Sequence, residues 1–385
     1  MVLDLQAVKH QTIALCMIVK DEEEVILRAL KSVKNFVDYY CICDTGSTDN
    51  TIQVIRDYLD DNNLSGVVVE RPWVNFAHNR TEAFQFAYGK CDYLMTLDAD
   101  EVFAAWDGIT PQLDKRIVCL PKLEADRVNV HTYFPSLVYR RSSFLRDAAG
   151  PWTWVSPVHE VPVSPNEQTA YTLKDCCVVP SKDGARAKDP NRFLWDAFVL
   201  ERAVIEEPND HRLKFYLGQS YQDCGKTDRA IEAYLDCATK TAWEEEASVA
   251  YLRVARIYAS QKNFDKALTC YWKSYNKYPS RGEALFDLLH HYRTTGEYNS
   301  GVAVGELLQK CDPKQSVLFT ENEIYLWRAN DELSICYYYV GRFQEGLDLA
   351  KSVISCPQTP SGELSRLREN IKWFEDAIKQ THGVS

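Results

Sequence analysis

The chain has 385 residues, 45% of them hydrophobic and 26% charged, and its 55 acidic against 44 basic side chains give a net charge of −11. This composition is that of a folded protein and excludes a disordered or low-complexity chain. The length favours two domains, because single hydrophobic cores rarely grow beyond about 250–300 residues. The acidic balance argues against binding of nucleic acid through a basic surface.

The thirteen cysteines are scattered, without a Cys-x-x-Cys pair or a Cys/His cluster at zinc spacing. We expect free, mostly buried thiols. The sequence shows neither a secretory leader pattern nor an apolar run approaching about 18 residues. These features predict a cytoplasmic, reducing location and no transmembrane segment.

In the first half, short apolar runs alternate with amphipathic stretches. Strands are expected at residues 12–19, 39–43, 66–70 and 93–97, and helices at 21–33, 48–59 and 81–88. The acidic residues 21–24 suit the first turn of the first helix. This alternation predicts an α/β domain with a mainly parallel sheet flanked by helices on both faces, whose ligands bind at the carboxyl ends of the strands.

After residues 111–190, an irregular stretch that completes this domain, the pattern becomes helical and repetitive. Tyr221, Ala230 and Tyr234 recur 37 residues later as Tyr258, Ala267 and Tyr271. The predicted organisation is therefore an α/β domain at 1–190 and an all-α repeat domain at 191–385. Most of the repeated positions serve helix packing.

Two carboxylates are placed where a strand is expected to end, in the segment Asp92 to Phe103. Because strand side chains alternate between faces, Asp98 and Asp100 point the same way. Mg²⁺ and Mn²⁺ are held in this manner, by one or two carboxylates with water and substrate phosphate. The alternative is an ordinary surface loop.

A second polar segment, Asp44 to Thr51, follows the expected strand at 39–43 and enters a helix. Capping explains Ser47, Thr48 and Asp49 but leaves Asp44 unexplained. Asp44 is therefore a candidate acceptor of a hydrogen bond from a nucleobase or ribose.

Taken in order, the segments Met17 to Glu23, Asp44 to Thr51 and Leu97 to Glu101 resemble the family 2 glycosyltransferases of the GT-A fold. The resemblance covers roughly residues 12–190, and includes Asn75 to Arg80 and Val158 to Glu160. The second half resembles tetratricopeptide repeats, which follow this domain in a subgroup of the family. Thr45 and Asp21 depart from the family pattern and leave the preferred nucleotide open.

The resemblance implies a role for each matching residue. The expected nucleotide-binding residues are Val19, Lys20, Glu22, Asp44, Arg80 and Asp98. The expected metal ligands for Mn²⁺ or Mg²⁺ are Asp98, Asp100 and His159. Glu160 is the first candidate for the catalytic base of an inverting reaction and Glu101 the second.

Several residues have two interpretations. His159 is either a metal or phosphate ligand or a buried histidine paired with the backbone. Trp152 and Trp154 form either a platform for a sugar or part of the core. Lys182, Arg186 and Arg192 either cover the phosphates or lie in a solvated loop, which is the expected case.

The distribution of charge along the sequence also favours a metal cofactor. Residues 1–110 hold 18 acidic and 9 basic side chains, and so carry −9 of the net charge. A nucleotide-sugar pyrophosphate would need a cation in such surroundings, because the Gly-rich phosphate loops are absent.

The sequence therefore predicts a metal-dependent, inverting glycosyltransferase. A nucleotide diphosphate sugar, with UDP-sugar favoured, would be the donor, and a glycan, peptide or protein the acceptor. The repeats would bind a protein partner or mediate self-association. The alternatives are a repeat scaffold with a degenerate catalytic domain and a nucleotidyltransferase, although the latter lacks the expected Gly-rich loop.

Overall fold

The computed structural model describes residues 11–115, 117, 120, 122–134, 137–166 and 168–382. The chain divides into two compact units, Met1–Phe134 with Tyr139–Asn209 and Pro135–Val138 with Asp210–Ser385. The main division thus falls after Asn209, one helix beyond the boundary predicted near residue 190. Each unit is described by itself.

The first unit contains a sheet with strand order β3-β2-β1-β4-β8-β7-β11-β5-β6. Its parallel part comprises β1 (Ile13–Val19), β2 (Tyr39–Asp44), β3 (Gly66–Glu70) and β4 (Tyr93–Thr96). These four strands lie where the sequence predicts them. The carboxyl ends of β1, β2 and β4 therefore meet at one edge of the sheet.

The other side of the sheet is mixed in direction. It comprises β5 (Glu101–Trp106), β6 (Pro111–Gln112), β7 (Arg127–Phe134), β8 (Leu137–Arg146) and β11 (Ala170–Pro180). Antiparallel pairs join β4 to β8, β5 to β11 and β5 to β6, whereas β11 runs parallel to β7. A separate hairpin is formed by β9 (Thr153–Val155) and β10 (Val161–Val163).

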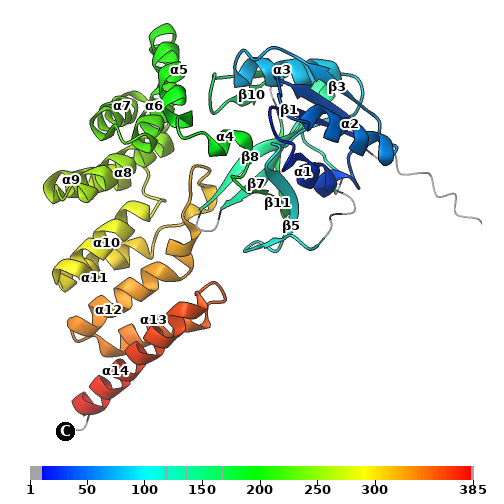
Figure 1. Cartoon of the computed structure of the whole chain (residues 1–385). Helices are drawn as coiled ribbons and strands as arrows, with labels where there is room; N and C mark the ends of the chain where they lie inside the picture. The colour runs from blue at the N-terminus through cyan, green and yellow to red at the C-terminus, as the bar shows by residue number, and fades with distance from the viewer. Residues whose placement is uncertain are drawn as a thin grey trace, which may run out of the picture. The chain divides into compact units, whose positions relative to one another are not determined.

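Helices cover both faces of the sheet, as predicted (Figure 1). One core includes residues of α1 (Ile26–Val33) and α2 (Thr51–Asp61), and the other includes residues of α3 (Phe76–Ala87). The acidic residues 21–24 precede α1 and do not form its first turn, contrary to the prediction. Asp21 has a φ of 55°, which a right-handed helix does not accommodate.

Two helices after β11 remain with the first unit, α4 (Ala185–Lys188) and α5 (Arg192–Glu206). Trp195 of α5 packs near Trp73, with ring centroids 6.3 Å apart, and Asp196 pairs with Arg186. These contacts explain why α5 continues the first unit although its sequence resembles the repeats.

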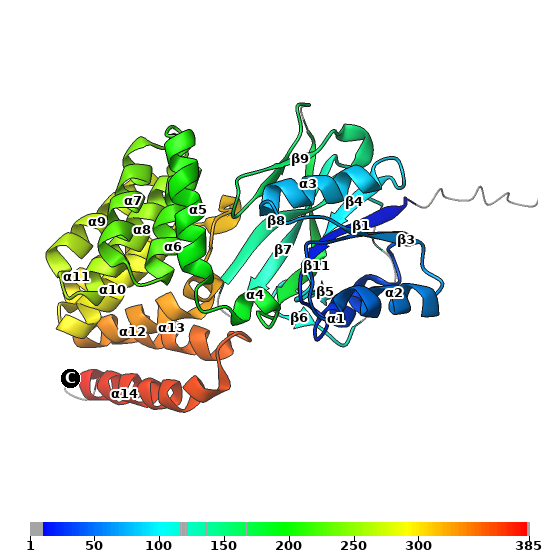
Figure 2. The same cartoon turned by 45° about the horizontal axis from the view of Figure 1, so that its top comes forward.

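The second unit is a series of helix pairs in chain order (Figure 2). The pairs are α6 (His211–Asp223) with α7 (Thr227–Lys240), α8 (Glu244–Ser260) with α9 (Phe264–Lys277), α10 (Glu283–Thr295) with α11 (Tyr298–Leu308), and α12 (Ala329–Tyr339) with α13 (Phe343–Ser355). Helix α14 (Leu364–His382) packs on α13. The repeat positions Ala230, Tyr234 and Ala267 are fully buried, which confirms their predicted packing role.

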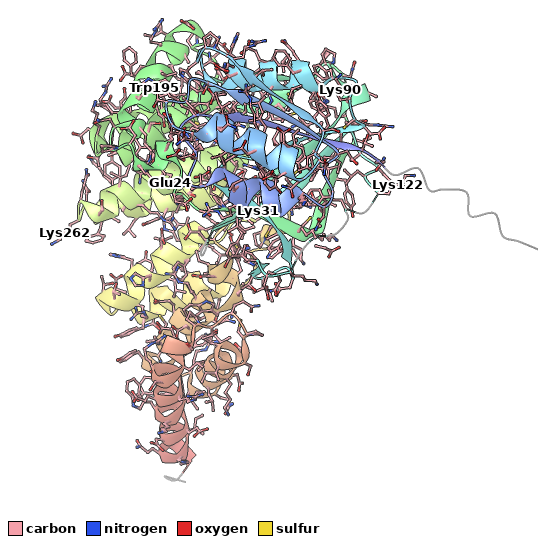
Figure 3. The ribbon with its side chains drawn as sticks, turned by 45° about the vertical axis from the view of Figure 1, so that its right-hand side comes forward. Glu24, Lys31, Lys90, Lys122, Trp195 and Lys262 are labelled. Carbon is pink, nitrogen blue, oxygen red and sulfur yellow. The ribbon has the colours of Figure 1, made fainter. Side chains whose placement is uncertain are left out.

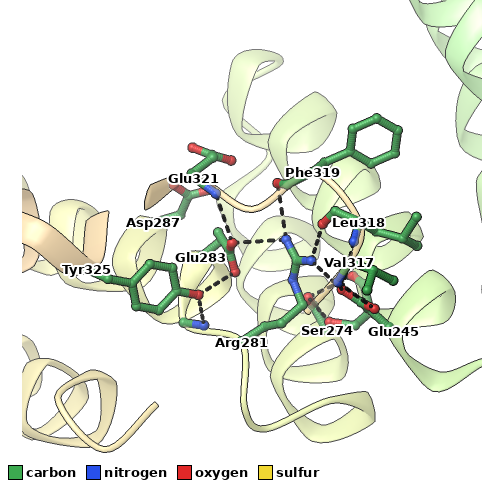
Figure 4. Close-up of polar contacts among 12 residues, drawn as sticks. Glu245, Ser274, Arg281, Glu283, Asp287, Val317, Leu318, Phe319, Glu321 and Tyr325 are labelled. Atoms are coloured by element: carbon green, nitrogen blue, oxygen red, sulfur yellow. Dashed lines mark hydrogen bonds and ion pairs between the residues drawn. The ribbon is translucent and has the colours of Figure 1, made fainter. Parts of the chain in front are cut away.

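The connection between α11 and α12 packs against earlier helices through buried charges (Figure 4). Glu245 of α8 accepts hydrogen bonds from the backbone N–H groups of Val317 and Leu318, at 2.9 and 3.0 Å. Arg281 donates to the carbonyl oxygens of Leu318 and Phe319 and pairs with Glu245. The segment is thus held through its backbone.

Glu283 completes this network. Its carboxylate pairs with Arg281 at 2.9 Å and accepts a hydrogen bond from the Tyr325 hydroxyl at 2.8 Å. Arg281, Glu245 and Glu283 are at most 3% exposed, so the two carboxylates share one buried cation and depend on neutral N–H and O–H donors for their other contacts.

Farther along the repeats, a cavity of about 440 Å³ lies among residues of α10, α12 and α14, with Arg293, Tyr339 and Trp373 in its lining. The cysteines that the structure describes are all free, as predicted. Among the described helices, none is both long and apolar enough to cross a bilayer.

Candidate active site

The turns after β1 and β2 are hydrogen-bonded to each other. The Asp21 carboxylate accepts from the Thr48 backbone N–H at 2.6 Å, and Thr51 Oγ1 accepts from the Glu22 backbone N–H at 2.7 Å. Thr45 Oγ1 donates to the Val19 carbonyl at 3.0 Å. Thr45 and Asp21, the two departures from the family pattern, therefore help to join these turns.

Asp44 is 1% exposed and closes its own turn. Its carboxylate accepts from the backbone N–H groups of Gly46 and Ser47, each at 2.9 Å, and from the Ser47 hydroxyl. Asp44, which helix capping does not explain, therefore has a structural role in closing this turn. Its contact with a nucleotide remains a prediction.

Arg80 of α3 connects two of the predicted acidic site residues. Its guanidinium lies 2.6 Å from the Asp98 carboxylate and 2.5 Å from that of Glu160. The side chains of Arg80 and Glu160 are each 11% exposed, whereas that of Asp98 is 39% exposed. Burial opposes the ionisation of Asp98, but the neighbouring guanidinium groups hold the pKa of its carboxyl below the usual range.

Glu101, the second candidate base, is 4% exposed and forms a two-point ion pair with Arg141 of β8, at 2.9 and 2.5 Å. Its carboxylate also accepts from the Asp98 backbone N–H at 2.9 Å. Burial raises the pKa of Glu101, and the positive charge of Arg141 opposes this increase. These contacts give Glu101 a role in fixing the turn that carries Asp98.

The segment between β11 and α5 lies against Glu22 and Asp100. The Ala185 backbone N–H donates to both oxygens of the Glu22 carboxylate, each at 3.2 Å. A Cβ atom at Gly184 would lie 3.0 Å from a Glu22 carboxylate oxygen and 3.2 Å from the Asp100 Cβ. Only glycine fits this approach without displacing its neighbours.

Ion pairs also hold the segment between β11 and α5 in place. Arg28 binds Asp183 at 2.6 Å, and Lys188 binds Glu24 at 2.6 Å. Arg186 pairs with Asp196 and stacks on Phe76, and the guanidinium of Arg192 donates to the Ala187 carbonyl. Lys182 and Arg186 are exposed to solvent, as expected, but the segment is held by these contacts and includes the short helix α4, so it is not simply a loop.

Acidic side chains are crowded at this edge of the sheet. Burial raises the pKa of Glu22 to about 7, and the charges of Asp100 and Asp98 contribute to the increase. Burial also raises the pKa of Asp100, and the negative charge of Asp98 raises it further. Carboxylates in this situation favour a hard divalent cation that relieves their repulsion.

The three predicted metal ligands do not form a three-residue site. Within the described ranges, no three or more Asp, Glu, His and Cys side chains are grouped closely enough to bind one metal ion. His159, half-buried and with a φ of 54°, therefore does not complete a set with Asp98 and Asp100. A pair of carboxylates still fits a cation that keeps water and substrate phosphate as its other ligands.

The two aromatic candidates occupy different surroundings. Trp152 is completely buried and donates to the Arg146 carbonyl at 2.8 Å, so it belongs to the core and is not a platform. Trp154 packs on Phe84 and lies 5.4 Å from the Arg80 guanidinium. Of the first-motif residues, Val19 is buried in the core and Lys20 is exposed.

Sequence reasoning missed Arg141 and the backbone of residues 184–185. Arg141 follows an irregular stretch, and its partner Glu101 is 40 residues away, so no local pattern connects them. For residues 184–185 a signal was available: the dipeptide Asp183-Gly184 indicates a sharp turn close after an apolar strand.

Comparison with known proteins finds a family match in the first unit. Residues 14–114 match the family model described as glycosyl transferase family 2. The N-terminal part of the chain is therefore similar to that family, which confirms the predicted resemblance.

Curated relatives agree over short stretches. The chain is 36% identical over 106 residues to a TPR repeat-containing protein of Synechococcus elongatus, covering 27% of this chain and 24% of that protein. It is 34% identical over 86 residues to an uncharacterized glycosyltransferase of Rickettsia typhi, covering 22% and 26%. The matched stretch thus spans about a quarter of each relative.

Solved structures resemble the chain only loosely. A tetratricopeptide repeat protein from Parabacteroides merdae matches with a TM-score of 0.36 and 16% identity, covering 50% of this chain and 71% of that one. MamA matches with a TM-score of 0.35 and 16% identity, covering 43% and 88%.

Proposed function

We propose that the first unit is a metal-dependent, inverting glycosyltransferase that transfers a sugar from a nucleotide diphosphate donor, with UDP-sugar favoured, to a hydroxyl group of an acceptor. One observation carries the proposal. Asp98 and Asp100 follow β4 at the edge where β1 and β2 also end, within a matched family 2 region. Ligands of parallel sheets bind at this edge.

The metal would be Mn²⁺ or Mg²⁺, held by Asp98 and Asp100. When bound, such a cation neutralises charge on a pyrophosphate and favours departure of the nucleoside diphosphate. The grouping of Glu22, Asp98 and Asp100 supports this assignment: burial is the main cause of the raised pKa values of Glu22 and Asp100, and the neighbouring carboxylates add to it, a repulsion that a cation would relieve.

The nucleotide would lie along the turns after β1 and β2, near Val19, Lys20, Glu22 and Asp44. The hydrogen bonds that join these turns fix the backbone to which a base and ribose would bind. Arg80 would orient Asp98 through their ion pair.

Glu160 is the better candidate for the base. A base must reach the acceptor hydroxyl and be able to take its proton. Both oxygens of Glu101 are bound to Arg141, whereas Arg80 connects Glu160 directly to Asp98. Glu160 would therefore act beside the metal site, and Glu101 would support it.

A thermal-shift panel of UDP-, GDP- and dTDP-sugars with and without Mn²⁺ tests the proposal. Stabilisation by a nucleotide sugar only with metal is expected, and Asp98→Asn should abolish it. Asp107→Asn is the matched control, because Asp107 is an exposed carboxylate of the same unit. Absence of stabilisation by all of these donors would contradict the proposal.

The alternative is a repeat scaffold whose catalytic domain no longer functions. One observation favours it: Arg80 forms ion pairs with both Asp98 and Glu160, the proposed metal ligand and the proposed base. Product analysis with labelled nucleotide sugar separates the two, because only an enzyme releases nucleoside diphosphate. Release of a nucleoside diphosphate also excludes nucleotidyl transfer.

A further inference from the structure

An aromatic cluster lies beside the candidate active site and takes no part in the proposed donor binding. Trp73 precedes α3, Phe76 begins α3, and Trp195 lies on α5. The ring centroids of Trp73 and Phe76 are 4.7 Å apart in an edge arrangement, and those of Trp73 and Trp195 are 6.3 Å apart. Figure 3 labels Trp195 on α5.

A guanidinium fixes this cluster. The Arg186 Cζ lies 4.8 Å from the Phe76 ring centroid and 5.6 Å from that of Trp195. Arg186 also pairs with Asp196, which is 4% exposed. Its charge is thus balanced inside the cluster, and the rings are held in place by a cation that stacks on two of them.

Part of the cluster is accessible. Trp195 is 37% exposed, although indole rings are usually largely covered. On either side in the sequence, Val74 is 54% exposed and Phe198 is 58% exposed. The cluster thus has a partly exposed apolar surface, and exposed apolar patches can mark binding sites.

The cluster adjoins the residues proposed for chemistry. Phe76 and Arg80 are four residues apart on α3, so they lie on the same face about one turn apart, a rise of about 6 Å. Arg80 in turn binds Asp98 and Glu160. One helical turn is comparable with the length of one sugar ring, so a ring stacked on the cluster would lie next to the reaction site.

We propose that Trp73, Phe76 and Trp195 form the acceptor subsite and that the acceptor is a carbohydrate chain. This inference rests on the proposed glycosyltransferase function. A pyranose ring has an apolar face of C–H groups, which stacks on an aromatic ring, and an edge of hydroxyl groups, which suits the partly exposed guanidinium of Arg186.

A peptide acceptor fits less well. An extended peptide requires polar partners for its backbone N–H and C=O groups. In the second unit, Glu245 and Arg281 provide such partners for Val317 and Leu318. The aromatic cluster offers ring surface instead.

Saturation-transfer NMR on the full chain tests the proposal. The probes are cello-, malto-, chito- and laminari-tetraose, together with a pool of capped Ser- and Thr-containing heptapeptides. At least one tetrasaccharide is expected to bind, and Trp195→Ala should weaken its binding about tenfold or more. Trp195→Phe, which keeps a ring, should retain most of it.

Trp243→Ala is the matched control, because Trp243 is an indole of the second unit that is 41% exposed. It should leave tetrasaccharide binding unchanged. The proposal is overturned if no tetrasaccharide binds, if Trp195→Ala binds as the unaltered protein does, or if the peptides bind through Trp195.

The same variants are measured in the nucleotide-sugar thermal shift with Mn²⁺, which separates this inference from the proposed function. Retained nucleotide binding with lost tetrasaccharide binding supports a separate acceptor subsite. Loss of both in the folded Trp195→Ala protein would place Trp195 in the donor site and overturn the inference. Nucleotide binding without any tetrasaccharide binding would leave the proposed function intact and refute the carbohydrate acceptor.

Discussion

Buried charge serves different purposes in the two units. In the second unit, Arg281 pairs with both Glu245 and Glu283, and the three side chains hold a segment of backbone. In the first, Glu22 and Asp100 bind backbone N–H groups of residues 184–185, and their like charges contribute to raised pKa values.

The charges in the second unit hold the structure together, whereas those of Glu22 and Asp100 are the ones proposed to serve function. A buried ion-pair network is costly to break, because removing one member leaves a charge buried without its partner, whereas crowded charge of one sign lowers stability until a ligand neutralises it. The first unit also contains a structural pair, Glu101 with Arg141, so the two kinds of charge lie side by side. Substitutions should distinguish them.

The largest effect is expected for Arg281→Met. This change leaves Glu245 and Glu283 buried without their cation, which costs about 3–5 kcal/mol of unfolding free energy. Urea unfolding followed by circular dichroism measures it. Arg342→Met is the control, because its ion pairs with Glu306 and Glu345 are largely exposed and should be worth less than about 1 kcal/mol.

For Glu101→Gln we expect a somewhat smaller loss of unfolding free energy, about 2–3 kcal/mol. Arg141 would then remain buried beside a neutral amide. The unfolding free energy and the rate of sugar transfer should fall together. Unchanged stability with abolished transfer would instead identify Glu101 as the catalytic base. Glu124→Gln, at a well-exposed carboxylate, serves as the comparison.

Asp100→Asn, unlike the two preceding substitutions, should not lower the stability of the protein. Removing one crowded charge should leave the melting temperature unchanged or raise it, while metal-dependent nucleotide binding weakens at least tenfold, or about 1.4 kcal/mol. Differential scanning calorimetry and titration with nucleotide sugar and Mn²⁺ provide the two readouts. A marked loss of stability would show that Asp100 is a structural charge.

The smallest effect concerns pH. Burial lowers the pKa of His131 to about 4, whereas in the unfolded chain it titrates near 6.5. Between these values the unfolded chain binds more protons, so the unfolding free energy falls as the pH falls. His131→Phe keeps the ring contact with Trp106 and should reduce the stability difference between pH 7 and pH 5 by about 1 kcal/mol.

Unfolding measured at the two pH values on both proteins checks this prediction. Equal pH dependence would show that His131 is not the group responsible.

The parallel half of the sheet could be predicted because its signals are local. Strands β1 and β3 are short apolar runs bounded by polar turns, and the intervening segments have helical periodicity. The Asp98 and Asp100 pair was placed correctly at a strand end for the same reason.

The long-range parts of the site could not be predicted. Arg80 reaches Glu160 across 80 residues, and Glu22 reaches Ala185 across 163. Helical periodicity also misplaced residues 21–24, because hydrogen bonds to the next turn outweigh their helix propensity. Such contacts depend on how the strands are ordered, which no short motif specifies.

The segment at Val317 to Phe319 has a consequence for recognition by the second unit. It satisfies Glu245 and Arg281 as a bound peptide would, but it is covalently attached. A tethered competitor acts at an effective concentration on the order of millimolar, so a free peptide that seeks these contacts loses much of its apparent affinity. A peptide partner of the repeats should therefore bind elsewhere, for which the cavity among α10, α12 and α14 offers room.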